Sequence, residues 1–230
     1  MARIIILSFL LTTACKVDSG KQSERLVAPI DTVVSNRHEP FDLQVRKYED
    51  PKRQTWQDPK FVIEALGNLN DLVIADIGSG TGYFTFQMAV PAQKVIAVDI
   101  EQRFLNYIED RKSEMYDRFL AEKIETRLTT PDTPSLKENE VDVVLIVNTI
   151  AYIKDRNQYL QVLKRGINDN GRLVIVDYKS GKMPVGPNED SKVSEEKISL
   201  ELRNAGFVID KIDNQSLQYQ YLIKAHKPAL

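Results

Sequence analysis

The stretch that decides the fold is Leu72-Val-Ile-Ala-Asp76-Ile-Gly78-Ser-Gly80-Thr-Gly82. Its first half is a short apolar run with β-branched residues, which is typical of a strand buried on both faces. Three glycines at alternate positions follow, and they let the backbone turn tightly and approach a ligand without interference from Cβ atoms. The residues from Gly82 to about Ala89 then predict a helix. Such strand–loop–helix units build parallel sheets.

A second predicted strand, Lys94-Val-Ile-Ala-Val-Asp99, follows this helix and ends in a carboxylate. A carboxylate at the tip of the adjacent strand can accept hydrogen bonds from the ribose hydroxyls of a nucleoside held by the glycine loop. The dinucleotide fingerprint is G-x-G-x-x-G, whereas this loop reads G-x-G-x-G and is preceded by Asp76. A carboxylate there repels a pyrophosphate but can orient the cationic amino-acid end of S-adenosylmethionine. The spacing therefore favours S-adenosylmethionine over NAD.

Short apolar runs and amphipathic stretches alternate along the rest of the chain, which is the pattern of βαβ units. The pattern predicts five further strands and three further helices. The strands are expected at 124–128, 141–147, 172–177, 207–213 and 217–224, and the helices at 101–120, 155–166 and 194–205. We therefore expect an α/β fold with a seven-stranded, mostly parallel sheet, helices on both faces and a closing antiparallel pair of strands.

Composition excludes several other classes of protein. The chain has 230 residues and a formal net charge of -2, which argues against a nucleic-acid partner that depends on bulk positive charge. A single cysteine, Cys15, excludes an intrachain disulfide and a cysteine cluster around a metal. With only two histidines, His38 and His226, we expect no metal site.

The glycine loop, Asp76 and Asp99 together resemble the signature of the class I S-adenosylmethionine-dependent methyltransferases, over about 170 residues. The resemblance implies a Rossmann-like methyltransferase domain over residues 71–228, with the strand order 3-2-1-4-5-7-6. It also implies a set of cofactor-binding residues, in which Ile100 packs on the adenine, Asp132 meets the adenine edge and Asn148 faces the methionine part. The full set is Asp76, Gly78, Ser79, Gly80, Gly82, Asp99, Ile100, Asp132 and Asn148.

Two other segments, Asp50–Pro59 and Gly206–Tyr221, are similar to a bacterial subgroup of exported methyltransferases. Members of that subgroup often carry Tyr-His-His after the fourth strand, where this chain has Ile150, Ala151 and Tyr152. The departure argues against a histidine base or a histidine-bound metal. The residues at 41–70, which include the lone tryptophan Trp56, are expected to form a helical lid.

Methyl transfer mainly requires alignment of the nucleophile, the methyl group and the sulfur, and a general base is needed only for a protonated nucleophile. Candidates for a catalytic role near the strand ends are Tyr152, Asp155 and Tyr178, together with Asp177. Each also has a structural interpretation. Asp155 fits a helix N-cap, Asp177 and Tyr178 fit polar strand ends, and Tyr152 fits a pocket wall.

The first fifteen residues indicate a lipoprotein signal peptide. Arg3 gives a positive start, Ile4–Leu11 is apolar but too short to span a bilayer as a helix, and small residues lead to Cys15. Lipidation of Cys15 would anchor the protein to a membrane, on the periplasmic side of the cell envelope, through a flexible tether at 16–40. The alternatives are a signal cleaved elsewhere and a buried strand, the latter placing the protein in the cytoplasm.

The sequence thus supports one main function and two alternatives. The main hypothesis is an enzyme that methylates a small-molecule or envelope-associated substrate with S-adenosylmethionine. A non-catalytic nucleoside-binding module tethered at a membrane is the first alternative. An NAD-linked oxidoreductase is the second, and it is disfavoured by the glycine spacing and by Asp76.

Overall fold

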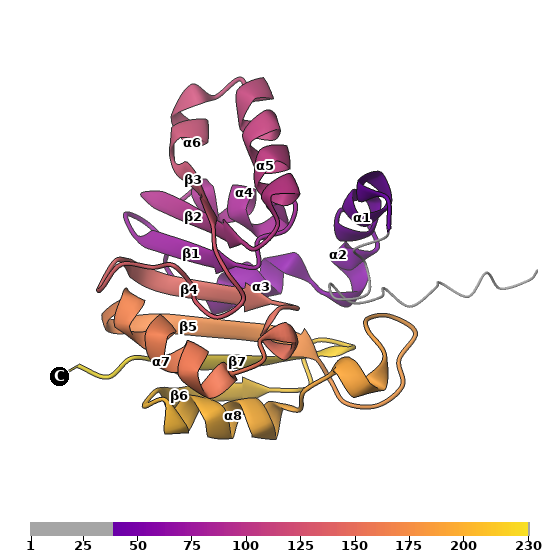
Figure 1. Cartoon of the computed structure of the whole chain (residues 1–230), viewed down its shortest axis with the longest axis vertical. Coiled ribbons are helices and arrows are strands. Elements are labelled where there is room, and N and C mark those ends of the chain that lie inside the picture. The colour runs from indigo at the N-terminus through magenta and orange to yellow at the C-terminus, as the bar shows by residue number, and fades with distance from the viewer. Residues whose placement is uncertain (1–38, 230) are drawn as a thin grey trace, which may run out of the picture.

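Seven strands form one sheet in the order β3-β2-β1-β4-β5-β7-β6 in the computed structural model, which describes residues 39–229 (Figure 1). The pairs β1–β2, β1–β4, β2–β3 and β4–β5 are parallel, whereas β7 is antiparallel to both of its neighbours, β5 and β6. The predicted sheet and strand order are therefore confirmed. The strands are β1 (Val73–Ile77), β2 (Lys94–Asp99), β3 (Ile124–Leu128), β4 (Val141–Val147), β5 (Ile167–Tyr178), β6 (Val208–Asp213) and β7 (Gln220–His226).

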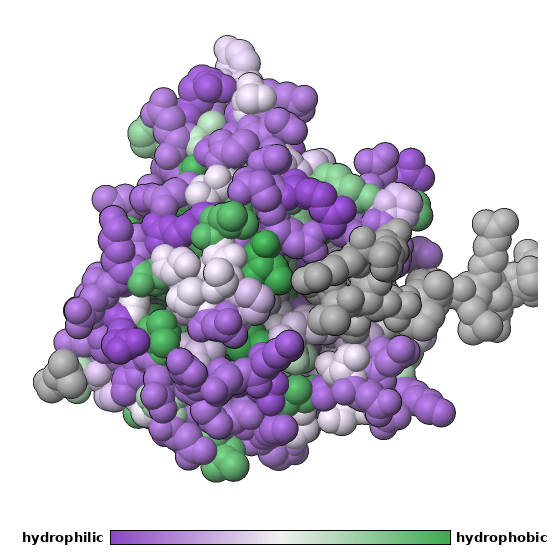
Figure 2. All heavy atoms as spheres, in the orientation of Figure 1, coloured by the Kyte–Doolittle hydropathy of each residue, from purple (hydrophilic) through white to green (hydrophobic). Residues whose placement is uncertain are grey.

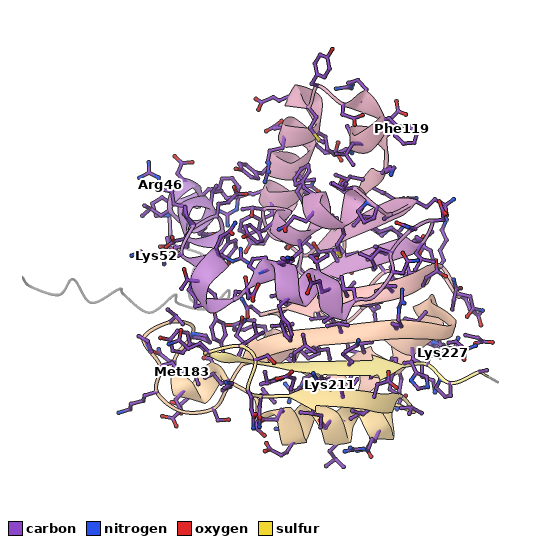
Figure 3. The ribbon with its side chains drawn as sticks, turned by 180° about the vertical axis from the view of Figure 1, so that it is seen from behind. Arg46, Lys52, Phe119, Met183, Lys211 and Lys227 are labelled. Carbon is purple, nitrogen blue, oxygen red and sulfur yellow. The ribbon has the colours of Figure 1, made fainter. Side chains whose placement is uncertain are left out.

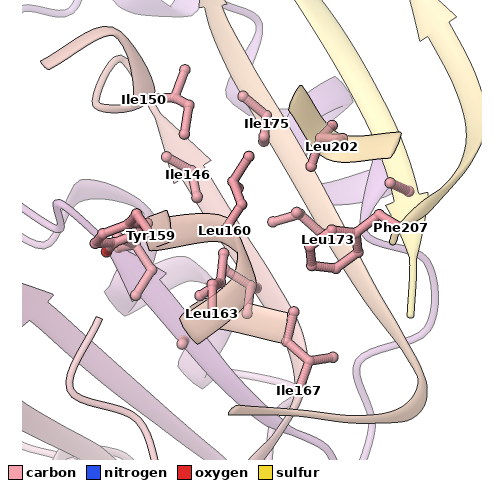
Figure 4. Close-up of a cluster of buried hydrophobic side chains, with 14 of the residues drawn as sticks. Ile146, Ile150, Tyr159, Leu160, Leu163, Ile167, Leu173, Ile175, Leu202 and Phe207 are labelled. Carbon is pink, nitrogen blue, oxygen red and sulfur yellow. The ribbon is translucent and has the colours of Figure 1, made fainter. Parts of the chain in front are cut away.

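The central strands are apolar throughout because each face of the sheet has its own core. Successive residues of β4 illustrate this: Val144 and Ile146 pack in one cluster, whereas Val143, Leu145 and Val147 pack in the other. Helices α7 (Arg156–Gly166) and α8 (Glu195–Asn204) cover the first face, which is drawn in Figure 4. Helices α3 (Pro59–Ala65), α4 (Tyr83–Ala89) and α5 (Gln102–Glu114) cover the second.

Three predicted elements have clearly different bounds in the structure. The last strand, expected at 217–224, is β7 and begins only at Gln220. The single helix expected at 101–120 is wrong, because the chain is extended at Met115 and a second helix, α6 (Arg118–Glu122), begins after Asp117. The Asp117 side chain accepts a hydrogen bond from the Leu120 amide and so caps the new helix. Strand β5 begins at Ile167 and not at Arg172, with an irregularity in its pairing to β4 between Val141 and Val143.

The N-terminal segment contributes two short helices, α1 (Phe41–Tyr48) and α2 (Arg53–Trp56), at one end of the sheet. Figures 1 and 3 show that the loop containing Met183 flanks the same end. Two single-turn 3₁₀ helices, η2 (Ile150–Tyr152) and η3 (Glu189–Ser191), also lie in connections between larger elements. The face seen in Figure 2 is mostly hydrophilic, with hydrophobic residues in separate groups.

Across residues 39–229, no helix combines the length and the apolar character that a membrane span requires. The predicted signal peptide, Cys15, His38 and nearly all of the predicted tether lie outside the described residues.

Candidate functional site

The glycine loop makes a sharp turn between β1 and α4. Gly78, Gly80 and Gly82 all have positive φ angles, of 74°, 51° and 79°, which residues with a Cβ atom rarely adopt. The loop is also tied to the neighbouring strand, because the amides of Gly78 and Ser79 both donate to the Val98 carbonyl, at 2.8 and 3.1 Å. A Cβ atom at Gly78 would overlap the Thr149 side chain, so glycine is required there for space as well as for conformation.

Asp99 connects the end of β2 to the glycine loop. Its carboxylate accepts hydrogen bonds from the Gly80 amide at 2.8 Å and from the Glu101 amide at 2.9 Å. Burial raises the pKa of Asp99 to about 6, although these two amides oppose the rise. A carboxylate can accept about four hydrogen bonds, so the side chain can still accept bonds from a ligand.

Asp76 lies at the end of β1 and is almost completely buried, with 3% of its surface exposed. The Thr85 hydroxyl donates to it at 2.6 Å. Burial raises the pKa of this carboxyl to about 6, and the nearby charge of Asp99 adds to the rise. Both carboxylates line the same pocket, as their positions at the ends of adjacent parallel strands predict.

The pocket contains most, but not all, of the residues expected around a cofactor. Its wall includes Asp76, Gly78, Ser79, Gly80, Asp99, Ile100 and Asn148. Gly82 is not in the wall: it precedes α4 as the helix N-cap, and a Cβ there would press on Phe86 and Ile108. Asp132 is exposed and also lies outside the wall, whereas its neighbours Thr129, Thr130 and Pro131 line it.

Asn148 is held in an unusual backbone conformation at the end of β4, with φ of 54°. The side-chain oxygen of Asn148 accepts a hydrogen bond from the side-chain amide of Gln220 on β7. The backbone amide of Asn148 donates to the Val176 carbonyl of β5 at 2.8 Å. Contacts with two other strands therefore fix its position in the pocket wall.

The catalytic candidates separate into two groups. Tyr152 and Tyr178 line the pocket, whereas Asp155 and Asp177 do not. Asp155 is exposed and caps α7, accepting from the Gln158 amide at 3.0 Å, in agreement with its structural interpretation. Asp177 is buried and accepts from the backbone amides of Tyr178 at 2.7 Å and Ala151 at 3.4 Å. Asp177 thus holds the two segments that carry the tyrosines.

Three pocket residues come from α1, α2 and the start of α4: Tyr48, Arg53 and Tyr83. Sequence reasoning did not single out any of them, because isolated aromatic and basic residues in short helices carry no periodic signal. Trp56 lies in the wall as well, and its ring stacks on Tyr178 at 6.0 Å between centroids. The N-terminal helices therefore form one side of the pocket.

Helix α1 is attached to α5 through aromatic and ionic contacts. The rings of Phe41 and Tyr48 both lie 5.3 Å from that of Phe104. Arg111 pairs with Glu49 at 2.8 Å and donates to the Thr81 carbonyl at 3.3 Å. These contacts keep Tyr48 beside Gly80, where its ring would lie 3.3 Å from a Cβ atom added to the glycine.

Two polar atoms in this region are buried without partners. The hydroxyls of Ser79 and Thr81 are both enclosed, and neither forms a hydrogen bond within residues 39–229. Both residues line the pocket. Because buried hydroxyls normally have partners, these two are available to a polar ligand. In the same described residues, no group of three or more His, Cys, Asp or Glu side chains could hold a metal ion.

Comparison with known proteins agrees with this geometry. Residues 69–224 match the model of a family described as a methyltransferase domain. The match covers more than half of the chain, and the protein belongs to this family. Among solved structures, an S-adenosylmethionine-dependent methyltransferase from Aquifex aeolicus has the same fold, with a TM-score of 0.72 and 22% identity. That alignment covers 80% of this chain and 97% of the other.

Two curated relatives show a more distant similarity in sequence. The ubiquinone/menaquinone biosynthesis C-methyltransferase UbiE of Hahella chejuensis is 23% identical over 129 residues, covering 55% of this chain and 51% of the relative. The demethylmenaquinone methyltransferase of Tropheryma whipplei is 28% identical over 171 residues, covering 69% and 67%. The chain thus spans about half to two thirds of the length of these relatives.

Proposed function

We propose that this protein transfers a methyl group from S-adenosylmethionine to a small-molecule acceptor. The observation that carries the proposal is that Asp76 and Asp99, two buried carboxylates, flank a glycine turn in a single pocket. Such a pocket matches a nucleoside with a cationic amino-acid end, which needs ribose acceptors and a counter-charge but no phosphate-binding group. Membership of the methyltransferase domain family agrees with the same ligand.

The residues of the pocket fit this cofactor. Asp99 would accept bonds from the ribose hydroxyls, Asp76 would face the ammonium end, and the exposed side of Ile100 would cover the adenine. The unpartnered hydroxyl of Ser79 offers a further polar contact. We place Asn148 beside the methionine part, as predicted. Asp132 does not line the pocket, so we leave it out of this set.

Methyl transfer requires the protein mainly to position the acceptor against the methyl group, and less to supply groups that take part in bond formation. S-adenosylmethionine supplies a methyl group on a positively charged sulfur. The chain's residues then hold both ligands: the glycine loop and the acids orient one, and the aromatic wall of Trp56, Tyr152 and Tyr178 orients the other. Alignment of this kind can lower a barrier by about 7–11 kcal/mol. The N-terminal helices, residues 41–70, would exclude water as a lid.

A second function, nucleoside binding without catalysis, is favoured by one observation. Neither Asp155 nor Asp177 lines the pocket, so the acidic candidates for a general base are absent from it. Calorimetry separates the alternatives in part, because micromolar binding of S-adenosylmethionine without binding of NADH excludes the oxidoreductase. Formation of S-adenosylhomocysteine in the presence of cell-envelope extracts or a demethylated quinol then separates an enzyme from a binding module. Absence of turnover with every acceptor would favour the module.

We also propose that residues 1–15 direct export and that Cys15 is lipidated, which would place the methyltransferase domain, at 71–228, on the periplasmic side of the cell envelope. Arg3, the apolar run Ile4–Leu11 and the small residues before Cys15 support this proposal. Mass spectrometry of the N-terminus of the native protein tests it. An acylated N-terminal Cys15 is the expected result, with loss of membrane association in Cys15→Ser. Retention of residues 1–14 would refute the proposal.

A further inference from the structure

Arg53 is a buried cation whose contacts are with neutral groups. Only 8% of its surface is exposed, and it lines the pocket. Its Nε donates to the Gln57 side-chain oxygen at 2.8 Å, and Nη1 donates to the Tyr48 carbonyl. The guanidinium lies over the ring of Tyr83, 4.1 Å from its centroid. Among residues 39–229, no carboxylate forms an ion pair with it.

A buried guanidinium without a counter-charge is costly, because burial removes water from the cation. Accordingly, burial lowers the pKa of Arg53. Tyr178, Tyr83, Glu49 and Asp76 oppose this shift, but none of them forms an ion pair with Arg53 within residues 39–229. Arginine is also suited to such a position, because its planar fork binds a carboxylate through two parallel hydrogen bonds. A bound anion would supply the missing charge.

The surroundings of Arg53 indicate which ligand would bring that anion. Trp56 and Tyr178 stack on each other with an angle of 29° between their planes, and both line the pocket together with Arg53 and Tyr83. Tyr178 ends β5, on the opposite side of β1 from Asp99. Arg53 thus lies among aromatic residues of the pocket, and within residues 39–229 it forms no ion pair with Asp99, the carboxylate that we assign to the ribose.

We propose that Arg53 binds an anionic oxygen group of the methyl acceptor, and that the acceptor is a flat, acidic molecule. This inference rests on the proposed methyl transfer and names its substrate class. It also explains how the aromatic half works without an aspartate or glutamate base. An acceptor that arrives as an anion donates its electron pair to the methyl carbon while the pair of the breaking carbon–sulfur bond goes to sulfur, so no proton has to be removed.

The lone tryptophan offers a direct measurement, because Trp56 lies beside Arg53 in the pocket and no other tryptophan contributes to the fluorescence. The protein, with and without saturating S-adenosylhomocysteine, is titrated with 2-naphthoate and benzoate, and with their neutral amides. We expect the carboxylates to bind at least tenfold more tightly than the amides. In Arg53→Gln this preference should fall below twofold.

Three further measurements make the test specific. Arg53→Lys keeps the positive charge but not the planar guanidinium, and it should retain part of the preference for carboxylates over amides. It also replaces Arg53→Gln in the test if that variant does not fold. Arg46→Gln is the matched control, because Arg46 is an exposed arginine of α1 that does not line the pocket, and its preference should be unchanged. Calorimetry with S-adenosylhomocysteine should give affinities within twofold for wild type and Arg53→Gln.

Two results would overturn the proposal. One is the absence of any preference for carboxylates in the wild type, or a preference that survives in Arg53→Gln. The other is a tenfold loss of S-adenosylhomocysteine affinity in Arg53→Gln with unchanged binding of 5′-methylthioadenosine, which lacks the carboxylate; Arg53 would then serve the cofactor. Failure of the wild type to bind S-adenosylhomocysteine would instead refute the proposed function, and the two failures are distinguishable.

Discussion

The two halves of the pocket are built in different ways. The half around Asp76 and Asp99 comes from one continuous run of chain, the unit β1–loop–α4–β2, and backbone amides and glycines make most of its contacts. The half around Arg53, Trp56, Tyr152 and Tyr178 gathers side chains from segments far apart in the sequence. A local unit leaves a motif that can be recognised in the sequence, whereas a wall assembled from distant segments does not. The assembled wall can change, and with it the substrate, while the motif stays the same.

The largest effect is expected in the local half, from Gly78→Ala. The new Cβ would overlap Thr149 in a backbone that already has positive φ. We expect a loss of about 2–4 kcal/mol in the free energy of unfolding, measured by urea denaturation, and loss of detectable S-adenosylhomocysteine binding. Gly181→Ala is the control, because Gly181 has φ of 96° but no atom near its missing Cβ. Equal effects at the two positions would contradict the steric argument.

The next largest effect is expected at Asp99, the carboxylate that we assign to the ribose. Asp99→Asn removes the charge that the amides of Gly80 and Glu101 now stabilise, and it weakens acceptance of ligand hydroxyls. We expect affinity for S-adenosylhomocysteine to fall about 10–100-fold, which corresponds to one charged hydrogen bond. Calorimetry is the measurement. Asp132→Asn serves as the matched control and should stay within twofold of wild type; a comparable loss there would return Asp132 to the site.

A pH dependence distinguishes the acidic half from the aromatic half. The pKa values of Asp76 and Asp99 rise to about 6 from an ordinary value of 3.8. Because the folded protein holds these protons while the unfolded chain loses them, both groups favour folding below pH 4 and lose that contribution as pH rises to 6. Ligand binding runs the opposite way, since the cationic end of S-adenosylhomocysteine needs ionised carboxylates.

Affinity for S-adenosylhomocysteine should therefore be at least about tenfold weaker at pH 5 than at pH 7.5, because about a tenth of each such carboxyl is ionised at pH 5. Calorimetry across this range is the measurement, and Asp76→Asn should remove the part of the dependence that comes from Asp76, leaving that of Asp99. A profile that is flat in the wild type would show that neither carboxylate contacts the charged end of the ligand.

The smallest effect is expected outside both halves. Asp155→Ala removes the N-cap of α7 and should cost about 1 kcal/mol in the free energy of unfolding, without changing S-adenosylhomocysteine affinity. Asp155→Ser should recover most of the loss. Urea denaturation and calorimetry on the same samples are sufficient. If Asp155→Ala lost more free energy of binding than free energy of unfolding, Asp155 would be part of the pocket.

The sequence predicted the fold well because its strongest patterns are local. Runs of β-branched residues marked the central strands, and Ser194 and Asp155 marked helix starts that the structure confirms. The helix expected at 101–120 was wrong because a mainly polar stretch hid the break at Met115, where Asp117 starts a new helix. The start of β5 was placed late because Asn170-Gly171 is a sequence typical of a turn, whereas the strand runs through it with irregular pairing to β4.

Sequence alone determined that a glycine turn lies between a buried strand and a helix, and that two carboxylates end adjacent strands, because these features depend on backbone conformation and on nearest neighbours in the chain. Only the tertiary structure decided that Asp132 stays outside the pocket, and that Arg53 and Trp56 enter it beside Tyr178. Burial of a guanidinium among rings depends on how α2 packs against the end of β5 and the start of α4, and no local pattern of residues records that packing.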